Sequence, residues 1–357
     1  MLRRFRSASQ LLHRPKRSGP SVLVRHLVGV QAQLSTAGLA LRARTESLTA
    51  ARVDRARLRD RTIVLTWAMR GTLHLVAAED IGWLTDLIVA SNPGSSNRRL
   101  REMGVGPDQT TAGVRAIERM LDREGPMTRA EIGERLRRRG LPTEGQILPH
   151  LLWLAAARAS VCFGPDRDGQ RTHVLVRDWL GAPRLMDRDS ALAELAVRYL
   201  RSHAPATPTD LSSWSGVRVS DAKRGWRAIE DRLVEVATVR GPMWMLGNRE
   251  PEVPPGLVRL LPSFDEFLLG WKDRSPVARP DHWRKIHPGA GWYHPAALVD
   301  GRGVGTWKAD RGPDVTRIEV RPFTRLSPAV WRGLQAEADA LSRYLGEATG
   351  LTVSPHA

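Results

Sequence analysis

The feature that most constrains the fold of this chain is a repeat. In each copy, helical segments are followed by two short strands with a turn between them. In the middle copy, Thr128 and Glu131 have the spacing of a capping box, and Gly140 ends the helix that they open. The full copy comprises helices over 111–123, 128–140 and 143–159 and strands over 160–163 and 172–176. Three helices and a hairpin in this order predict a winged helix.

The same order occurs twice more along the chain. The later copy has its hairpin turn at Arg240-Gly241, and the earlier, looser copy has its turn at Arg70-Gly71. The later copy comprises helices over 190–201, 210–214 and 220–232 and strands over 233–239 and 243–246. The earlier copy comprises helices over 21–41 and 50–58 and strands over 62–69 and 72–76. Three copies predict a tandem array of winged-helix modules.

From Gly256 onward the chain is rich in proline and glycine, and strand patterns dominate. The predicted elements are strands over 258–261, 296–299, 305–308 and 315–320 and an amphipathic helix over 328–345. The predicted fold class is mainly α with β (α+β), in which three tandem winged helices precede a small β-rich domain with a closing helix. The predicted domains are 1–108, 109–186, 187–254 and 255–357.

The charge of the chain indicates a polyanionic partner. Lys and Arg exceed Asp and Glu by 17 among 357 residues, and basic side chains gain free energy by releasing the counterions around phosphates. No basic amphipathic helix with an aromatic face is evident, so we expect DNA and not a membrane surface. The longest apolar stretch, 151–157, is far shorter than the ~18 residues that a membrane span requires. The basic N-terminus lacks the apolar segment of a secretion signal, which predicts mature sequence.

The cysteine and histidine content excludes several kinds of chemistry. Cys162 is the single cysteine, so internal disulfides and thiolate-built zinc sites are excluded, and a reducing cytosol is expected. The histidines show no metal-ligand spacing. We therefore expect a cytoplasmic, nucleoid-associated protein without a metal or a cofactor.

Winged helices bind DNA by placing one helix in the major groove and the hairpin beside the backbone, although many tandem winged helices are protein-binding scaffolds. An arginine cluster at 135 and 137–139 ends the second helix of the middle copy. Arg137 and Arg138 are our candidates for DNA contacts there. The alternative is a solvated helix end favoured by the helix dipole.

Three blocks of sequence, in this order, carry a resemblance to a known family. They are His-Leu-Val-Gly-Val-Gln-Ala-Gln at 26–33, Thr-Trp-Ala-Met-Arg-Gly-Thr-Leu-His-Leu at 66–75, and Pro-Ser-Phe-Asp-Glu-Phe-Leu-Leu-Gly-Trp-Lys-Asp-Arg-Ser at 262–275. Over essentially its whole length the chain resembles DNA glycosylases of the AlkZ and YcaQ type. The resemblance implies a C-shaped array of three winged helices with a C-terminal β domain. It also implies a substrate of double-stranded DNA with alkylated purines and, in several members, unhooking of interstrand crosslinks.

The catalytic motif of that family, Gln-x-Gln or Gln-x-Asp, falls on Gln31 and Gln33. The chain has the Gln-aliphatic-Gln form of the AlkZ-like branch, and it lacks the carboxylate that the YcaQ branch has at position 33. Side chains at i and i+2 point to different sides of a helix but to one side of an extended segment, so the pair can share a water only if the helix over 21–41 breaks or bends. Taken alone, two such glutamines more often are solvated or cap backbone groups.

A pair of amides suits an alkylated purine, because that base is already cationic and leaves without a general acid. Departure of the base gives a sugar with oxocarbenium character, as in glycoside hydrolysis. Two side-chain carbonyl oxygens could accept the protons of one water and direct it at the anomeric carbon.

Other candidate residues lie in the second and third blocks. Arg70, Thr72 and His74 at the first hairpin are candidates for contacts with the DNA backbone, and a structural role for His74 is the alternative. Lys272 and Arg274 could bind a phosphate, with an ion pair to Asp273 as the alternative.

The remaining charged residues of the third block have weaker functional interpretations. Asp265 and Glu266 could form a catalytic carboxylate pair, but flanking phenylalanines favour a loop that anchors on the core. Lys272 is the only lysine in a recognisable motif that could form a Schiff base, and we do not favour that role.

Two further classes of function remain open. A non-catalytic winged-helix transcriptional regulator predicts a symmetric dimer on spaced half-sites, and a protein-interaction scaffold predicts no salt-dependent affinity for DNA. Three unequal modules in one chain favour a monomer that encircles its substrate. We therefore predict a monofunctional, monomeric DNA glycosylase of base excision repair.

Overall fold

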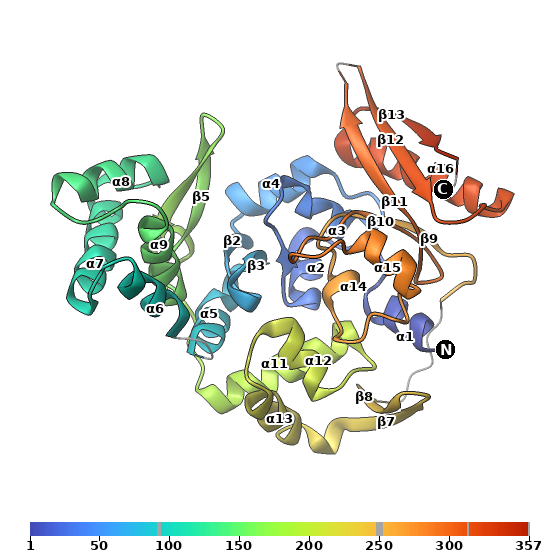
Figure 1. The fold of residues 1–357 in the computed structure, drawn as a ribbon, viewed down its shortest axis with the longest axis horizontal. Helices are drawn as coiled ribbons and strands as arrows, with labels where there is room; N and C mark the ends of the chain where they lie inside the picture. The colour runs from blue at the N-terminus through green and yellow to red at the C-terminus, as the bar shows by residue number, and fades with distance from the viewer. Residues whose placement is uncertain (91–93, 248–252, 313, 356–357) are drawn as a thin grey trace.

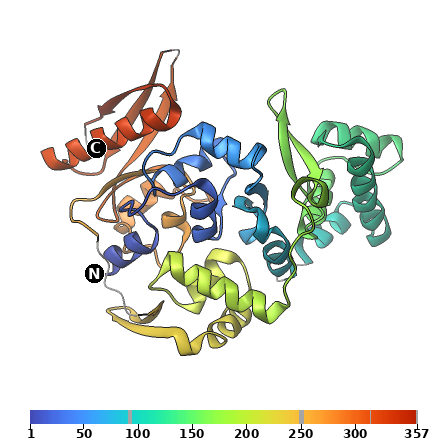
Figure 2. The ribbon, with the colours of Figure 1, turned by 180° about the vertical axis from the view of Figure 1, so that it is seen from behind.

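The computed structural model describes residues 1–90, 94–247, 253–312 and 314–355. Within these ranges helices and strands are both abundant, and the strands form four separate sheets with helices around them, which confirms the α+β class. Figures 1 and 2 show the segment around α7 to β6 standing to one side of the molecule, whereas the N-terminal and C-terminal segments lie together.

The N-terminal segment forms a three-stranded sheet flanked by short helices. The sheet order is β1-β3-β2, and both pairings are antiparallel. Its elements are α1 (Leu2–Ser9), α2 (Pro20–Leu27), β1 (Val30–Gln31), α3 (Gly38–Arg42), α4 (Ala50–Leu58), β2 (Ile63–Trp67) and β3 (Leu73–Ala77).

The helical segment predicted over 21–41 is interrupted, because the chain leaves the helix at Val28. Val28 adopts a left-handed conformation with φ 67°, and Val30 and Gln31 then pair with β3. Gly29 permits this close approach: a Cβ there would lie 2.8 Å from the Met69 side chain. Pairing with a distant strand therefore overrides local helix propensity at the point where the glutamine motif begins.

The middle segment has the element order predicted for a winged helix. Its elements are α5 (Ile81–Ala90), α6 (Gly94–Glu102), α7 (Pro107–Glu124), β4 (Met127–Thr128), α8 (Arg129–Arg138), α9 (Ile147–Ala157), β5 (Val161–Arg167), β6 (Gln170–Leu175) and α10 (Val176–Leu180). The capping box is confirmed, since the Thr128 hydroxyl accepts from the Glu131 amide at 3.3 Å and a Glu131 oxygen accepts from the Thr128 amide at 2.8 Å.

The third segment also contains the predicted helices and hairpin. Its elements are α11 (Arg188–His203), α12 (Pro208–Ser215), α13 (Val219–Arg227), β7 (Leu233–Thr238) and β8 (Gly241–Leu246). The helix predicted to reach Arg232 ends at Arg227, and a separate 3-10 turn covers Glu230–Arg232.

The C-terminal segment is a five-stranded sheet in the order β13-β12-β11-β10-β9, on which α16 packs. Its elements are β9 (Val258–Leu261), α14 (Glu266–Leu269), α15 (Pro280–Ile286), β10 (Ala296–Val299), β11 (Arg302–Arg311), β12 (Val315–Pro322), α16 (Pro328–Leu345) and β13 (Ala348–Val353). The strand β13 pairs parallel to β12 and was not predicted.

The hydrophobic cores connect all four predicted domains, since Cys162, Val174 and Val176 of the middle segment belong to the largest one. Buried side chains of the N-terminal segment share clusters with those of the third and C-terminal segments, whereas residues 100–175 also have a core of their own. This shared packing holds the 264–275 loop against the glutamine motif. The division into four domains and the number of winged-helix modules stay predictions.

Candidate active site around Gln31 and Gln33

The two glutamines point to the same place. Gln31 is the last residue of β1, and Gln33 lies at a bend two residues later, outside any helix, so their side chains can meet. The Nε2 group of Gln31 donates a hydrogen bond to Oε1 of Gln33 at 2.6 Å. Gln31 is only 6% exposed, whereas Gln33 is exposed to solvent. The motif therefore presents one fixed amide and one accessible amide.

Arg70 determines which way the two amides face. It lies at the turn between β2 and β3 with φ 56°, and its Nη2 donates to Oε1 of Gln31 at 2.7 Å. Its Nη1 donates to the backbone carbonyl of Trp214. Because a guanidinium group has donors only, Gln31 must turn its oxygen toward Arg70 and its NH2 toward Gln33. Gln33 must then turn its own oxygen toward Gln31, and each amide oxygen keeps a second lone pair.

Glu266 supports this arrangement from within the protein. One carboxylate oxygen accepts from the Gln31 backbone amide at 3.0 Å, and the other accepts from Nε1 of Trp214 at 2.8 Å. Since Arg70 contacts both Trp214 and Gln31, the four residues form a closed ring of hydrogen bonds. Burial raises the pKa of the Glu266 carboxyl group.

Asp265 fixes the loop that carries Glu266. Its two carboxylate oxygens accept from Nη1 and Nη2 of Arg44, each at 2.8 Å, and both side chains are fully buried. One of these oxygens also accepts from the Phe267 amide at 2.9 Å and caps α14. Asp265 and Glu266 thus anchor the loop on the core, in agreement with the structural interpretation of the third block.

The two glutamines line a pocket of about 380 Å³. The other residues around it are Arg70, Thr72, Ser213, Phe264, Leu269, Arg274, Gly291 and Tyr293. The Thr72 hydroxyl donates to the Met69 carbonyl at 3.0 Å. Nη1 of Arg274 is buried and has no hydrogen-bond partner within the described ranges. The pocket therefore combines two neutral amides with the guanidinium groups of Arg70 and Arg274.

His74 lies beside Gln31 in the sheet and is fully buried. Burial lowers the pKa of His74 to about 3, and the Arg70 charge acts in the same direction. Its Nδ1 lies 2.9 Å from the Thr72 carbonyl. A fully enclosed, neutral ring has no surface to offer a phosphate, so this placement corresponds to the structural alternative.

The remaining predicted DNA contacts lie outside the pocket. Lys272 is exposed, and its backbone amide donates to Asp210 at 2.9 Å. Arg240, on the β7–β8 hairpin, forms an ion pair with Asp273. Arg137 and Arg138 end α8, and both form ion pairs with Glu134 of the same helix.

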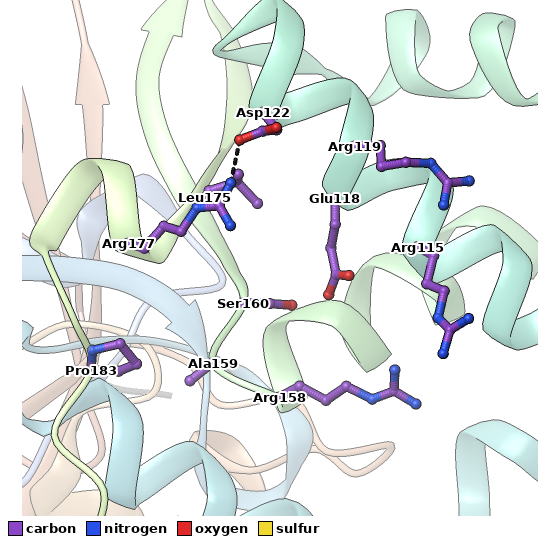
Figure 3. Close-up of a pocket in the computed structure, with 10 residues that line it drawn as sticks. All are labelled: Arg115, Glu118, Arg119, Asp122, Arg158, Ala159, Ser160, Leu175, Arg177 and Pro183. Carbon is purple, nitrogen blue, oxygen red and sulfur yellow. Dashed lines mark hydrogen bonds and ion pairs between the residues drawn. The ribbon is translucent and has the colours of Figure 1, made fainter.

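A second pocket, of about 450 Å³, lies between α7 and the start of β5. Arginines 115, 119 and 158 lie on one side of it, and Asp122 forms an ion pair with Arg177 on another (Figure 3). Glu118 also lines this pocket, so its charge is mixed, and it contains none of the residues singled out from the sequence.

Within the described ranges no cluster of His, Cys, Asp and Glu has the arrangement of a metal site. The part of the chain that the structure describes also contains no helix with the length and apolar character of a membrane span.

Sequence reasoning missed the residues that complete the pocket from distant segments. Ser213 and Tyr293, which line the pocket, and Trp214, which supports Gln31 through Arg70 and Glu266, lie about 180 or more residues after Gln31 along the chain, and their local patterns gave no signal. A signal for Glu266 existed, because a charged residue within the apolar run 264–269 needs a buried partner.

Comparison with known proteins shows the family of the chain. The family model described as DNA glycosylase AlkZ-like matches residues 24–344. The chain belongs to the AlkZ-like family of DNA glycosylases. A similar curated protein is the interstrand DNA cross-link repair glycosylase of Streptomyces sahachiroi, which is 29% identical over 96% of this chain and 95% of the relative. The solved structure of Streptomyces sahachiroi DNA glycosylase AlkZ covers 99% of this AlkZ-like chain and 98% of its own, with a TM-score of 0.83 and 27% identity.

Proposed function

We propose that this AlkZ-like protein hydrolyses the N-glycosidic bond of alkylated, cationic purines in double-stranded DNA, with Gln31 and Gln33 holding the attacking water. The observation that carries the proposal is the contact of Arg70 with Gln31, which orients both amides at the pocket wall. Each amide oxygen keeps one lone pair for a proton of the same water.

The reaction needs little acid or base assistance. When the bond between the anomeric carbon and the base nitrogen breaks, its electron pair neutralises the cationic purine, which leaves as a neutral base. The water oxygen then bonds to the anomeric carbon, and the displaced proton passes to solvent. The two amides contribute by positioning this water close to the oxocarbenium-like sugar. An unmodified purine is neutral, so it remains a poor leaving group in this site.

The proposal extends to interstrand crosslinks. The Streptomyces relative is named as an interstrand DNA cross-link repair glycosylase. A crosslink formed through purine ring nitrogens carries the same cationic leaving group at each end, so one hydrolysis releases one strand. The exposed position of Gln33 leaves the pocket open to a base that stays attached to a larger adduct.

DNA binding is proposed to be electrostatic and to involve one copy of the chain. Lys272, Arg137 and Arg138 are exposed and suit contacts with backbone phosphates. Thr72 and Arg274 line the pocket, so they would meet the backbone next to the lesion. Arg70 is engaged with Gln31, and we assign it to orienting the site.

The direct test uses duplex DNA with a single N7-methylated purine. After incubation with the protein, alkali cleaves abasic sites, and strand breaks report excision. We expect breaks at the lesion that are absent with undamaged duplex and strongly reduced with Gln31→Ala. A wild-type protein that produces no breaks with methylated or crosslinked duplex would contradict the proposal.

The chemistry should also be monofunctional and independent of metal ions. Excision is expected to continue in the presence of a chelator, and borohydride should trap no covalent adduct between protein and DNA. Trapping that disappears in Lys272→Ala would instead assign a Schiff-base lyase.

A further inference from the structure

Three aromatic side chains from two distant segments meet at the edge of the Gln31 pocket. Phe264 and Tyr293 line the pocket, and their ring centroids lie 6.0 Å apart. The Trp292 ring is edge-on to Phe264, with centroids 5.3 Å apart and an interplanar angle of 84°. We refer to Phe264, Trp292 and Tyr293 as the aromatic rim.

Trp292 is notable for its exposure. It is 43% exposed, although tryptophan is highly buried on average in folded proteins. Trp331 has a similar exposure of 40%, but it lies on α16 beside the C-terminal sheet, whereas Trp292 stands between two residues that line the pocket, Gly291 and Tyr293. The chain therefore offers two equally exposed tryptophans, of which one adjoins the candidate active site.

The aromatic rim is held in place by its own turn. The Trp292 amide donates to the Gly289 carbonyl at 2.9 Å, and Gly289 and Gly291 have φ values of 118° and 73° that suit a tight turn. Tyr293 stacks on His287 with centroids 4.4 Å apart, and Nδ1 of His287 lies 2.6 Å from the Trp292 carbonyl. Rings that are already ordered lose little conformational freedom when a ligand stacks on them.

We propose that the aromatic rim is a stacking site for a purine base that has left the duplex stack. This assignment rests on the proposed glycosylase function and specifies the form in which that site receives its substrate. Nucleobases stack on aromatic side chains in proteins that bind unpaired nucleotides. The pocket of about 380 Å³ falls in the range of ~300 to 1,000 Å³ typical of small-molecule sites.

The charge of the lesion adds selectivity at the aromatic rim. A cation over the face of a tryptophan or tyrosine is attracted by the ring quadrupole, and tryptophan gives the strongest attraction. A purine alkylated at a ring nitrogen carries that positive charge, and an unmodified purine does not. Trp292 and Tyr293 therefore favour the cationic base before any bond breaks.

A binding experiment tests the stacking site without requiring catalysis. The probe is a duplex with one unpaired 2-aminopurine, whose fluorescence is quenched when it stacks on an aromatic ring. We expect quenching with wild type, with Trp292→Phe and with the matched control Trp331→Ala, and loss of most of it with Trp292→Ala. The assignment would be overturned if Trp292→Ala quenched the probe as strongly as wild type does. It would also be overturned if Trp331→Ala lost as much quenching as Trp292→Ala.

An excision experiment then separates this assignment from the glycosylase function itself. In single turnover on a methylated purine, Trp292→Ala should be slower by about 10-fold or more, the range expected for losing one stacked ring. Its affinity for undamaged duplex should be unchanged, and Trp292→Phe should restore most of the rate. If wild type excises the base and Trp292→Ala is equally fast, the stacking role of the aromatic rim is rejected and the glycosylase function stands. If wild type itself is inactive, the glycosylase function is rejected.

Discussion

The guanidinium group of Arg70 lies 2.7 Å from Oε1 of Gln31, and this contact sets the direction of the hydrogen bond between the two glutamine side chains. A donor-only partner leaves Gln31 a single orientation, in which its NH2 group faces Gln33. The left-handed turn at Arg70 brings the side chain to this position. A residue that sequence reasoning assigned to DNA contact is thus built into the site itself.

Replacing Arg70 should therefore slow catalysis more than binding. Arg70→Ala frees the Gln31 amide to rotate, and we expect single-turnover excision to fall by roughly 10- to 100-fold, as for the loss of one preorganised hydrogen bond. Duplex affinity should change little. Arg70→Lys should recover part of the rate, because an ammonium group is also donor-only. Arg25→Ala, which removes an exposed ion pair with Glu79, is the control. Unaltered excision by Arg70→Ala would show that the contact is dispensable.

The buried pair of Arg44 and Asp265 should matter for stability. Asp265→Ala leaves an uncompensated buried guanidinium group, and we expect the free energy of unfolding in urea to fall by about 3 to 5 kcal/mol. Asp60→Ala removes the carboxylate of an exposed pair with Arg55 and should cost no more than about 1 kcal/mol. Similar losses in the two variants would contradict the anchoring role of Asp265.

Acid should destabilise the protein in part through His74. Its pKa is about 3 in the folded state and ~6.5 in an unfolded chain. Between these values the unfolded state binds more protons, so stability decreases as the pH falls from 7 toward 3. From pH 7 to pH 5 this group alone accounts for about 2 kcal/mol.

Urea unfolding of wild type and His74→Phe at pH 7 and pH 5 measures this contribution. The variant should lose less stability than wild type over that interval. His173, whose pKa burial lowers to about 4, contributes to the slope in both proteins and cancels in the comparison. Identical losses would show that His74 is not held neutral.

DNA affinity should depend strongly on salt. With about six or more phosphates neutralised, duplex affinity should drop by orders of magnitude between ~50 and ~200 mM salt. Replacing Arg137 and Arg138 together should weaken binding and reduce the slope without changing lesion preference. The matched control is Glu134→Gln, which removes the acidic partner of both arginines and should strengthen binding. A flat salt response would contradict electrostatic binding.

The sequence predicted the fold well where the local residue pattern is enough to determine a helix or a strand. The strands at 258–261 and 296–299 and the helix at 328–345 have the predicted bounds. The prediction failed where a distant partner decides the conformation. Val28 leaves its helix because β3 pairs with the next residues, and β13 forms because β12 lies beside it.

In the candidate site, too, local sequence patterns predicted the residues of the motif and not their distant partners. Gln31 and Gln33 were found from the motif, and the break in the helix that their pairing requires is present. The support of Gln31 by Glu266 joins residues 235 positions apart, so no local pattern could reveal it. The side-chain roles proposed for both glutamines stay predictions.

The most direct test of the account is single-turnover excision of a methylated purine by Gln31→Ala, Gln33→Ala and the double variant. Each single change should lower the rate by roughly 10- to 1000-fold with duplex affinity nearly intact, because a positioned hydrogen bond to the water is lost. Since the two amides act as one unit, the double variant should be little worse than the poorer single variant. Gln33→Asp should retain activity, since a carboxylate there adds general-base power. Unchanged excision by the double variant, with its fold verified by circular dichroism, would mean that the pair is structural and that the active site lies elsewhere.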